Sequence, residues 1–371
     1  MHKKRLPYLL FAAMTVTALL AAACAPAATA VISTATTAPT TAAPTTAAPT
    51  TAPATNTAAA TTAPQATNTA APATSTVEPT AAAVELGTAD HPIIMAIAPS
   101  ATSDTLIASG NALADLLAKE TGLTIKAVVP TNYQAMIQAM CSGNAQIGWL
   151  PPFAYLVAQQ TMAKDASGKD VPCADVAYVA LRNGLDHYAT QFIGKTGVFT
   201  PGTTLDALKQ FEGKKPCWTD PLSASGYVIP ASLLASQKVK TKAAAFVQGH
   251  PTVVRAVYAG GICDFGATFV DARTDSGIQK DLPDVKDKVI VVYQTDNIIP
   301  NDTVGFAYDV PAELRAKLTA ALDKVSKSEE GAAALKTLYS IDGLQSADDT
   351  FFDEFRVLLA ASGIDVASLV R

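Results

Sequence analysis

Apolar and polar positions change in short blocks along residues 89–371, and their spacing predicts strands and helices in alternation. Short apolar runs that end at Pro or Gly are typical of strands, whereas apolar residues three and four positions apart are typical of helices. The first block reads strand, helix, strand, helix, strand, at 91–99, 103–122, 123–130, 132–143 and 145–152. This order predicts a parallel sheet with right-handed crossovers.

A second block repeats the pattern, and a helical tail follows from Pro311. Strands are expected at 175–182, 189–197, 214–220, 243–249, 263–270 and 288–294, and helices at 203–212 and 224–237. Together the blocks predict an α/β protein with two lobes, each lobe a mostly parallel sheet flanked by helices.

The chain is expected to cross between the two lobes twice. Lobe 1 is placed at 89–188 and is completed by the returning segment 299–371, and lobe 2 is placed at 189–298. The crossings fall near 187–190 and 294–300. Two α/β lobes with returning C-terminal helices are typical of a two-lobed binding protein.

The first residues carry a different pattern, which predicts an export signal. A basic stretch at 2–5 precedes an apolar run at 6–20, and small residues follow up to Cys24. This arrangement indicates a secretory signal peptide at 1–23, which is too short for a stable membrane span. The cysteine after small residues resembles a bacterial lipobox, so Cys24 is expected to be lipidated and to anchor the protein to a membrane. Leu20 lies four residues before Cys24, where the strict pattern has it three before, and ordinary secretion is the alternative.

Residues 24–88 are nearly all Ala, Thr and Pro, and repeats such as "TTAAPTTAAPT" fill the segment. It has no Lys or Arg, no aromatic residue, and only Glu78 and Glu85 as acids. Such a composition cannot bury enough apolar surface to offset its ordering entropy. We expect a disordered, partly extended tether between the membrane and the folded part.

Charge and histidine positions exclude several functions. The formal charge of −5 becomes about −8 when the basic leader is removed, which argues against nucleic acid as a partner because phosphate backbones are held by clustered Lys and Arg. The histidines are dispersed along the chain, at His2, His91, His187 and His250. We therefore expect no metal and no cofactor.

Two sequence patterns that could indicate an enzyme or a nucleotide site fail on inspection. The run "GKTG" at 194–197 lacks the glycine that a P-loop requires five residues earlier, where Ala189 stands. No Ser lies in a G-x-S-x-G elbow. Catalysis by a hydrolase elbow or by a P-loop is therefore not expected.

Four cysteines remain once Cys24 is assigned to lipid: Cys141, Cys173, Cys217 and Cys263. An even number outside the cytosol suggests two disulfides, although the sequence allows three pairings. We favour Cys141–Cys173 and Cys217–Cys263, because each pair joins segments placed in one lobe. The spacings do not match a zinc site.

The stretch "CWTDPLSASGYVIP" at 217–230 places two serines and a glycine where a helix is expected to begin. If the helix starts near Ala224, Ser223 caps it, and the N–H groups of Ala224, Ser225 and Gly226 have no intrahelical acceptor. Such a helix end carries a partial positive charge and suits an oxyanion. A plain N-cap is the alternative.

This stretch resembles the signature of periplasmic substrate-binding proteins of ABC importers for phosphonate, phosphite and related phosphorus oxyanions. That signature is Asp-Pro-x-Ser-Thr-Ser-Gly, followed by an apolar residue and then Pro; here Asp220-Pro221-Leu222-Ser223-Ala224-Ser225-Gly226 and Pro230 match it. Other segments agree in type and order: "NYQAMIQAM", "IGWLPPFAYLVA", "HYATQFI", "VQGH" and "IIPND".

The resemblance covers about residues 90–365 and implies a type II periplasmic binding fold, with the ligand held between two lobes. It implies a monomeric, extracytoplasmic protein that is not an enzyme and that passes a small phosphorus oxyanion to a transmembrane ABC permease. The alternatives are a binding protein for another oxyanion such as a sulfonate, or an enzyme on the same fold that uses Cys217 or His250.

The resemblance also nominates ligand-binding residues: Tyr133, Tyr188, Ser223, Ala224, Ser225, Gly226, His250, Asp271 and Asp302. The serines and the backbone around Ala224 would hold phosphorus oxygens, and the tyrosines would complete the cage from the other lobe. His250 is a further polar neighbour. Asp271 and Asp302 align less well with acids that face a ligand amine in aminophosphonate binders.

Each nominated residue also has a structural alternative. Tyr133 could pack its ring, and Tyr188 also lies at an expected crossing between the lobes. His250 could close a strand-to-helix turn, Asp302 could cap a turn after Pro300, and Asp271 could be a solvated loop acid.

This chain departs from the family pattern at two positions. Ala224 stands in place of the usual Thr, which removes one hydroxyl, and Pro251 follows His250 where an acid is common.

Overall fold

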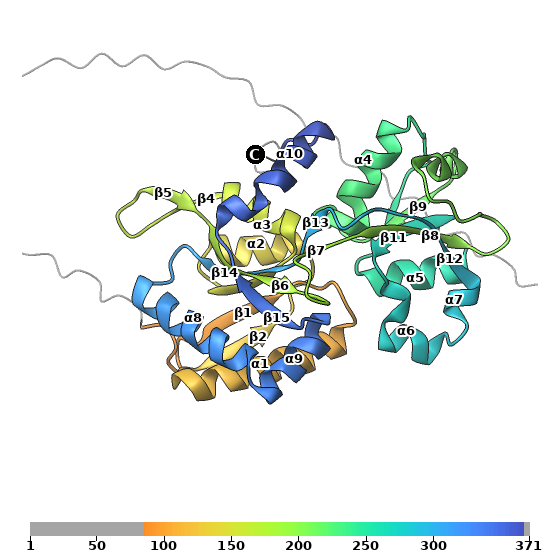
Figure 1. Cartoon of the computed structure of the whole chain (residues 1–371). Helices are drawn as coiled ribbons and strands as arrows, with labels where there is room; N and C mark the ends of the chain where they lie inside the picture. The colour runs from red at the N-terminus through yellow and green to blue at the C-terminus, as the bar shows by residue number, and fades with distance from the viewer. Residues whose placement is uncertain (1–84, 367–371) are drawn as a thin grey trace, which may run out of the picture. The chain divides into compact units, whose positions relative to one another are not determined.

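The computed structural model describes residues 85–366. The predicted leader, Cys24 and nearly all of the predicted tether lie outside the described residues. A six-stranded sheet with the order β15-β6-β14-β3-β1-β2 organises one part of the fold (Figure 1). Its strands are β1 (Ile93–Ile97), β2 (Ile125–Val128), β3 (Ile147–Leu150), β6 (Ala174–Leu181), β14 (Thr303–Ala307) and β15 (Gly343–Ser346).

Helices cover both faces of this sheet. On one face α1 packs against α8 and α9, and on the other face α2 packs against α3 (Figure 1). Their bounds are α1 (Ser103–Thr121), α2 (Tyr133–Cys141), α3 (Pro152–Gln160), α8 (Ala312–Ser326) and α9 (Glu329–Tyr339). The helix α1 stops at Gly122, which takes the left-handed conformation (φ 71°) that favours glycine and closes the helix with a bond to the carbonyl of Ala118. The chain ends in η4 (Asp349–Phe352) and α10 (Asp353–Ala361).

A five-stranded sheet with the order β10-β9-β11-β8-β12 organises the second part. Its strands are β8 (Thr190–Lys195), β9 (Pro216–Trp218), β10 (Ala245–Phe246), β11 (Phe265–Phe269) and β12 (Val289–Gln294). Around it lie η1 (Leu205–Phe211), η2 (Ala224–Val228), α4 (Ile229–Ser236), α5 (His250–Ala259), η3 (Ala272–Thr274), α6 (Ser276–Asp281) and α7 (Val285–Lys288).

A small ribbon joins the two sheets along the chain. It consists of β7 (His187–Tyr188) and β13 (Ile299–Pro300), which pair antiparallel. The strand β7 lies between β6 and β8 in the sequence, and β13 lies between β12 and β14, so both passages of the chain run through this ribbon (Figure 1). A separate hairpin pairs β4 (Met162–Lys164) with β5 (Asp170–Pro172).

Both sheets are mixed, which corrects the prediction of mostly parallel sheets. In the six-stranded sheet β2, β1 and β3 are parallel, but β14 is antiparallel to β3 and β6, and β15 is antiparallel to β6. In the five-stranded sheet β8 is antiparallel to both of its neighbours. In the six-stranded sheet the returning chain supplies the antiparallel strands β14 and β15. In the five-stranded sheet the antiparallel strand is β8, the first of that sheet along the chain.

The elements absent from the sequence prediction include β14, β15 and α3. The strand β14 is buried at all five positions and therefore shows no alternation. The strand β15 is a half-exposed run inside the tail that the sequence predicts as helical. In α3, seven of nine residues are buried, so the polar face that identifies a helix is missing.

Both favoured disulfide pairings are confirmed. Cys141 at the end of α2 is bonded to Cys173, with their Cα atoms 4.7 Å apart. Cys217 in β9 is bonded to Cys263 just before β11, with their Cα atoms 5.5 Å apart. Each bond joins segments associated with one sheet.

Candidate functional site

Residues 219–229, called here the serine segment, leave β9 and begin a helix at Ser223. The Asp220 carboxylate fixes the turn before the helix, because its Oδ1 accepts the N–H of Leu222 at 2.8 Å. Ser223 is the N-cap: its Oγ accepts the N–H of Gly226 at 3.1 Å. The first turn is the wide turn η2, and α4 continues it. The helix therefore begins where the sequence predicts.

The first turn of this helix presents buried hydrogen-bond donors. The N–H groups of Tyr227 and Val228 both donate to the Ser223 carbonyl, so Ala224 and Ser225 are the residues whose N–H groups helix geometry leaves without an intrahelical acceptor. Ser223, Ala224 and Ser225 are each 2% exposed or less. Buried N–H donors and hydroxyls at a helix start are suited to an oxyanion.

Tyr188 in β7 faces this helix start. Its phenol lies close to the side chain of Ser225. Burial and the nearby Asp302 carboxylate raise the pKa of the phenol well above its usual value, so it is neutral and can donate a hydrogen bond at any physiological pH. Thr190 holds the same turn from β8, since its Oγ1 donates to the Ser225 carbonyl at 2.7 Å.

Tyr133 and Tyr339 complete a cluster of three phenols. Burial raises the pKa of Tyr133, and the neighbouring Tyr339 phenol and Asp302 carboxylate raise it further. Burial and then Asp302 also raise the pKa of Tyr339, whose hydroxyl donates to the carbonyl of Ala98 and lies near Ser100. The three phenols and the Asp302 carboxylate therefore share one region.

Asp220 links the serine segment to α2. Its Oδ2 accepts the N–H of Tyr133 at 3.2 Å, which places a carboxylate at the N-terminus of α2, where negative charge is favoured. Burial raises the pKa of Asp220, and the N–H donors of Leu222 and Tyr133 oppose that rise. Leu222 and Ala224 belong to the same buried cluster as the core of the six-stranded sheet. The serine segment thus contacts elements of both sheets.

His250 is the first residue of α5 and is 3% exposed. Its Nδ1 accepts the N–H of Phe269 at 3.2 Å, and burial lowers its pKa to about 3. The imidazole is therefore neutral with its proton on Nε2, which makes it a donor. Pro251 occupies the first turn of α5, a position where a missing N–H costs nothing.

Asp271 and Asp302 are both ion-paired with arginines of this chain. Burial raises the pKa of Asp271, but Arg273 and Gln191 more than offset this and hold it below its usual value. Arg273 Nη2 lies 2.7 Å from Asp271 Oδ2, and Gln191 Nε2 donates to Oδ1 at 2.8 Å. Asp302 pairs with Arg182. Asp271 also caps η3 by accepting the N–H of Arg273, so it is not a solvated loop acid.

The nominated residues thus fall into two groups. Tyr133, Tyr188, Asp302 and the residues 223–226 surround the helix start. His250 and Asp271 lie at the end of β11, where a chain of bonds connects them to the first group: Gln191 bonds both Asp271 and Thr268, and Thr190 reaches the carbonyls of Thr268 and Ser225.

Sequence reasoning missed several residues of this region. Ser100 follows β1, and the sequence could have indicated it as a site residue, because ligands of α/β folds bind beyond the carboxyl ends of parallel strands. Tyr339 ends α9 and Arg182 follows β6, and no local pattern identifies either. Thr219 is 1% exposed, and its Oγ1 has no hydrogen-bond partner among the described residues.

The hydroxyls and N–H groups at the helix start are hydrogen-bond donors of the kind that bind an anion. Within residues 85–366, no group of three or more His, Cys, Asp or Glu side chains is placed to hold a metal ion. Cys217 is held in a disulfide and therefore offers no thiol for nucleophilic chemistry. No helix in the described part of the chain is both long and apolar enough to cross a membrane.

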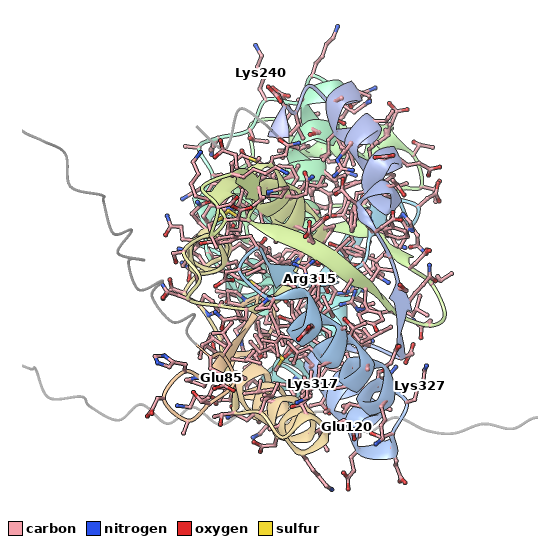
Figure 2. All side chains as sticks on the ribbon, turned by 90° about the vertical axis from the view of Figure 1, so that its left-hand side faces the viewer. Glu85, Glu120, Lys240, Arg315, Lys317 and Lys327 are labelled. Carbon is pink, nitrogen blue, oxygen red and sulfur yellow. A yellow bond between two sulfur atoms is a disulfide. The ribbon has the colours of Figure 1, made fainter. Side chains whose placement is uncertain are left out.

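A surface hollow lies elsewhere in the described part of the chain. It measures about 620 Å³ and runs along α8, where its lining includes Arg315 and Asp323. Arg315, labelled in Figure 2, pairs there with Asp175 at 3.0 Å. Because this hollow shares no lining residue with the serine segment and contains no cluster of hydroxyl donors, we do not assign it as the site.

Comparisons with known proteins agree with this geometry. The profile of the family described as "ABC transporter, phosphonate, periplasmic substrate-binding protein" matches residues 95–352. A curated relative, the phosphate-import protein PhnD of Mycolicibacterium smegmatis, is 30% identical over 187 residues, which are 48% of this chain and 54% of that protein. The chain thus spans about half the length of this relative.

Solved structures share the fold. A binding-protein component of an ABC phosphonate transporter from Pseudomonas aeruginosa has a TM-score of 0.62 at 19% identity, over 73% of this chain and 86% of that chain. PhnD1 from Prochlorococcus marinus, solved in complex with methylphosphonate, has a TM-score of 0.60 at 16% identity, over 72% of this chain and 97% of that chain. The fold is that of a type II periplasmic binding protein, as the sequence predicts. The family profile covers well over half of the chain, and the chain therefore belongs to the family of periplasmic substrate-binding proteins of phosphonate ABC transporters, which are transport proteins and not enzymes.

Proposed function

We propose that this protein is an extracytoplasmic, lipid-anchored binding protein that delivers a phosphorus oxyanion to an ABC permease. The observation that carries the proposal is the buried start of the helix at Ser223, with the phenols of Tyr188 and Tyr133 nearby. In this proposal Ser223, Ser225 and the N–H groups around Ala224 hold the phosphorus oxygens, and the phenols of Tyr133 and Tyr188 donate from the other side.

An acidic protein can bind an anion in this way. The formal charge of the chain is −5, but the proposed oxyanion site around residues 223–226, called here the anion seat, uses neutral donors. These are hydroxyls, phenols and backbone N–H groups at the positive end of a helix dipole. His250, neutral with its proton on Nε2, is a further donor on the side of β11.

The ligand class follows from the donors and from the names of the relatives. One relative is named for phosphate import, and one structural neighbour was solved with methylphosphonate. Both ligands are phosphorus oxyanions, and the serine segment offers the same kinds of donor to either. Ala224, 1% exposed, lacks the hydroxyl that the family usually has here, so we propose that this position adjusts the choice among phosphonate, phosphite and phosphate.

Thermal unfolding of the purified protein tests the ligand class. A phosphorus oxyanion at 100 times its Kd is expected to raise the free energy of unfolding by about 2.7 kcal/mol. The panel contains methylphosphonate, phosphite, phosphate, sulfate and methanesulfonate. If no phosphorus compound raises the melting temperature, the proposed ligand class is wrong, and a rise with methanesulfonate alone would assign the protein to sulfonate binding.

The proposed anchor is Cys24, with residues 24–88 as a tether and a monomeric, two-lobed binding domain beyond it, its lobes at 89–188 with 299–371 and at 189–298. Replacing Cys24 with Ser removes the thiol that would carry lipid, so the protein is expected to move from the membrane fraction to the soluble fraction. Fractionation of expressing cells measures this. The matched control is Ser33→Ala, which changes one side chain of the same region and leaves the cysteine. Membrane association that survives Cys24→Ser would contradict the lipid anchor.

A further inference from the structure

Asp302 lies beside the phenol cluster but is already paired with an arginine. Its charge acts on all three phenols, since it helps to raise the pKa values of Tyr133, Tyr188 and Tyr339. The Nη2 of Arg182 bonds its Oδ2, and the two side chains are only 22% and 15% exposed. A carboxylate that reaches the region of the proposed anion seat is thus neutralised from within the chain.

The guanidinium of Arg182 is fixed by two further groups. Its Nε donates to the carbonyl of Tyr339 at 2.8 Å, and its Nη1 donates to Oδ1 of Asn301 at 3.0 Å. Asn301 is fully buried, and its amide nitrogen donates to the carbonyls of Ala180 and Leu185. Because every one of these partners is itself held, Arg182 cannot turn away from Asp302 without leaving buried polar groups unpaired.

From this geometry we infer that Arg182 is a specificity-determining residue, which cancels the charge of Asp302 and makes the site select phosphorus oxyanions that carry no cationic group. The inference rests on the proposed function. An unpaired carboxylate beside the seat would repel a phosphonate dianion and attract an ammonium group on the ligand. Paired with a guanidinium, it does neither. Asp271 is paired in the same way with Arg273 and Gln191, so neither acid is free for a ligand amine.

The test compares two probes, methylphosphonate and 2-aminoethylphosphonate, by titration calorimetry on the full-length protein. The wild type is expected to bind methylphosphonate more tightly. Arg182→Met exposes the Asp302 charge, so it is expected to weaken methylphosphonate binding roughly tenfold or more and to shift the ratio of the two Kd values toward the aminophosphonate by at least that factor. A merely structural role for Arg182 would weaken both probes equally and leave the ratio unchanged.

Three further variants separate charge from structure. Arg182→Lys keeps the charge and is expected to keep the wild-type preference. The double variant Arg182→Met with Asp302→Asn removes both charges and is expected to return methylphosphonate binding to within about threefold of wild type. Arg315→Met is the matched control: it breaks the ion pair between Arg315 on α8, labelled in Figure 2, and Asp175 in β6, and it is expected to change neither Kd.

The outcomes are distinguishable from failure of the proposed function. A wild type that binds neither probe nor any other phosphorus oxyanion defeats the proposed function. A wild type that prefers the aminophosphonate, or an unchanged ratio in Arg182→Met, overturns only the inference. If Arg182→Met does not fold, Asp302→Asn alone decides: it leaves Arg182 unpaired and is expected to move the ratio further from the aminophosphonate, and a shift in the other direction or no shift overturns the inference.

Discussion

Replacing Ser223 and Ser225 together with Ala is expected to abolish oxyanion binding while leaving the protein folded. Each hydroxyl would form a hydrogen bond to a charged ligand, and such bonds are worth about 1.5–3 kcal/mol apiece. Losing both therefore weakens binding by roughly 10²–10⁴-fold. Titration calorimetry with phosphate and methylphosphonate measures the loss.

The cost to stability is expected to be much smaller than the loss of binding. Ser223 accepts the N–H of Gly226 as an N-cap, and removing such a cap costs about 1 kcal/mol. The Ser225 side chain lies close to the phenol of Tyr188, which loses this polar neighbour in the variant. Chemical denaturation of both proteins without ligand separates this stability term from binding.

A matched control lies on the same helix. Ser232 and Ser236 donate to carbonyls of their own helix, to Val228 and Leu233, at 2.8 Å each. Their double replacement with Ala removes two hydroxyls from α4 but none from the proposed seat, so its Kd is expected to equal that of the wild type. If the Ser223 and Ser225 variant binds within tenfold of the control, the anion seat lies elsewhere.

The helix start at Ser223 and both disulfides were predictable because their signals are local or countable. A cap residue, a preceding Asp-Pro and a following apolar run are read from consecutive residues. The disulfides followed from an even number of cysteines and from the placement of each pair in one lobe. The helix start and the disulfides can therefore be recognised from the sequence alone, and the structure contains both.

The partners of the nominated acids could not be predicted in the same way. Arg182 meets Asp302 across 120 residues, and only the pairing of β6 with β14 brings them together. Because β14 has no alternation of apolar and polar residues, that pairing is invisible to periodicity. Asp302 was therefore nominated as an acid for a ligand amine, whereas the structure pairs it with a guanidinium.

The position of the Tyr339 phenol could not be predicted for the same reason. It ends α9, a helix that the sequence placed only as part of a returning tail, and its hydroxyl reaches the carbonyl of Ala98 beyond β1. The packing of α9 on α1 creates this contact, which depends on tertiary structure alone. Site residues that such returning segments contribute can be identified only from the three-dimensional structure.

Gly226→Ala is expected to disable the site by steric conflict rather than by loss of a donor. A Cβ at Gly226 would lie 1.9 Å from Oγ1 and 2.6 Å from Cγ2 of Thr219, and 2.8 Å from Oγ of Ser223. Real Cβ atoms do not approach so closely, and Thr219 is 1% exposed, with little room to move. Overpacking of a buried site costs about 1–3 kcal/mol of stability.

In Gly226→Ala, the loss of binding affinity is expected to be larger than the loss of stability. The new methyl group would push on Ser223, the cap whose Oγ accepts the N–H of Gly226, and so displace the first turn that carries the donors. A shift of about 1 Å in a positioned binding group costs on the order of 10²-fold in function. Calorimetry with methylphosphonate and thermal unfolding without ligand measure the two effects separately.

Two comparisons establish the cause. Gly343→Ala is the control, since the nearest atom to its Cβ would be Leu181 Cδ1 at an ordinary 3.9 Å, and neither binding nor stability is expected to change beyond about 0.5 kcal/mol. Adding Thr219→Ala to Gly226→Ala removes the two closest atoms and is expected to recover most of the lost stability. If the double variant is no more stable than Gly226→Ala alone, the conflict with Thr219 is not the reason for the damage, and the requirement for glycine at this turn needs another explanation.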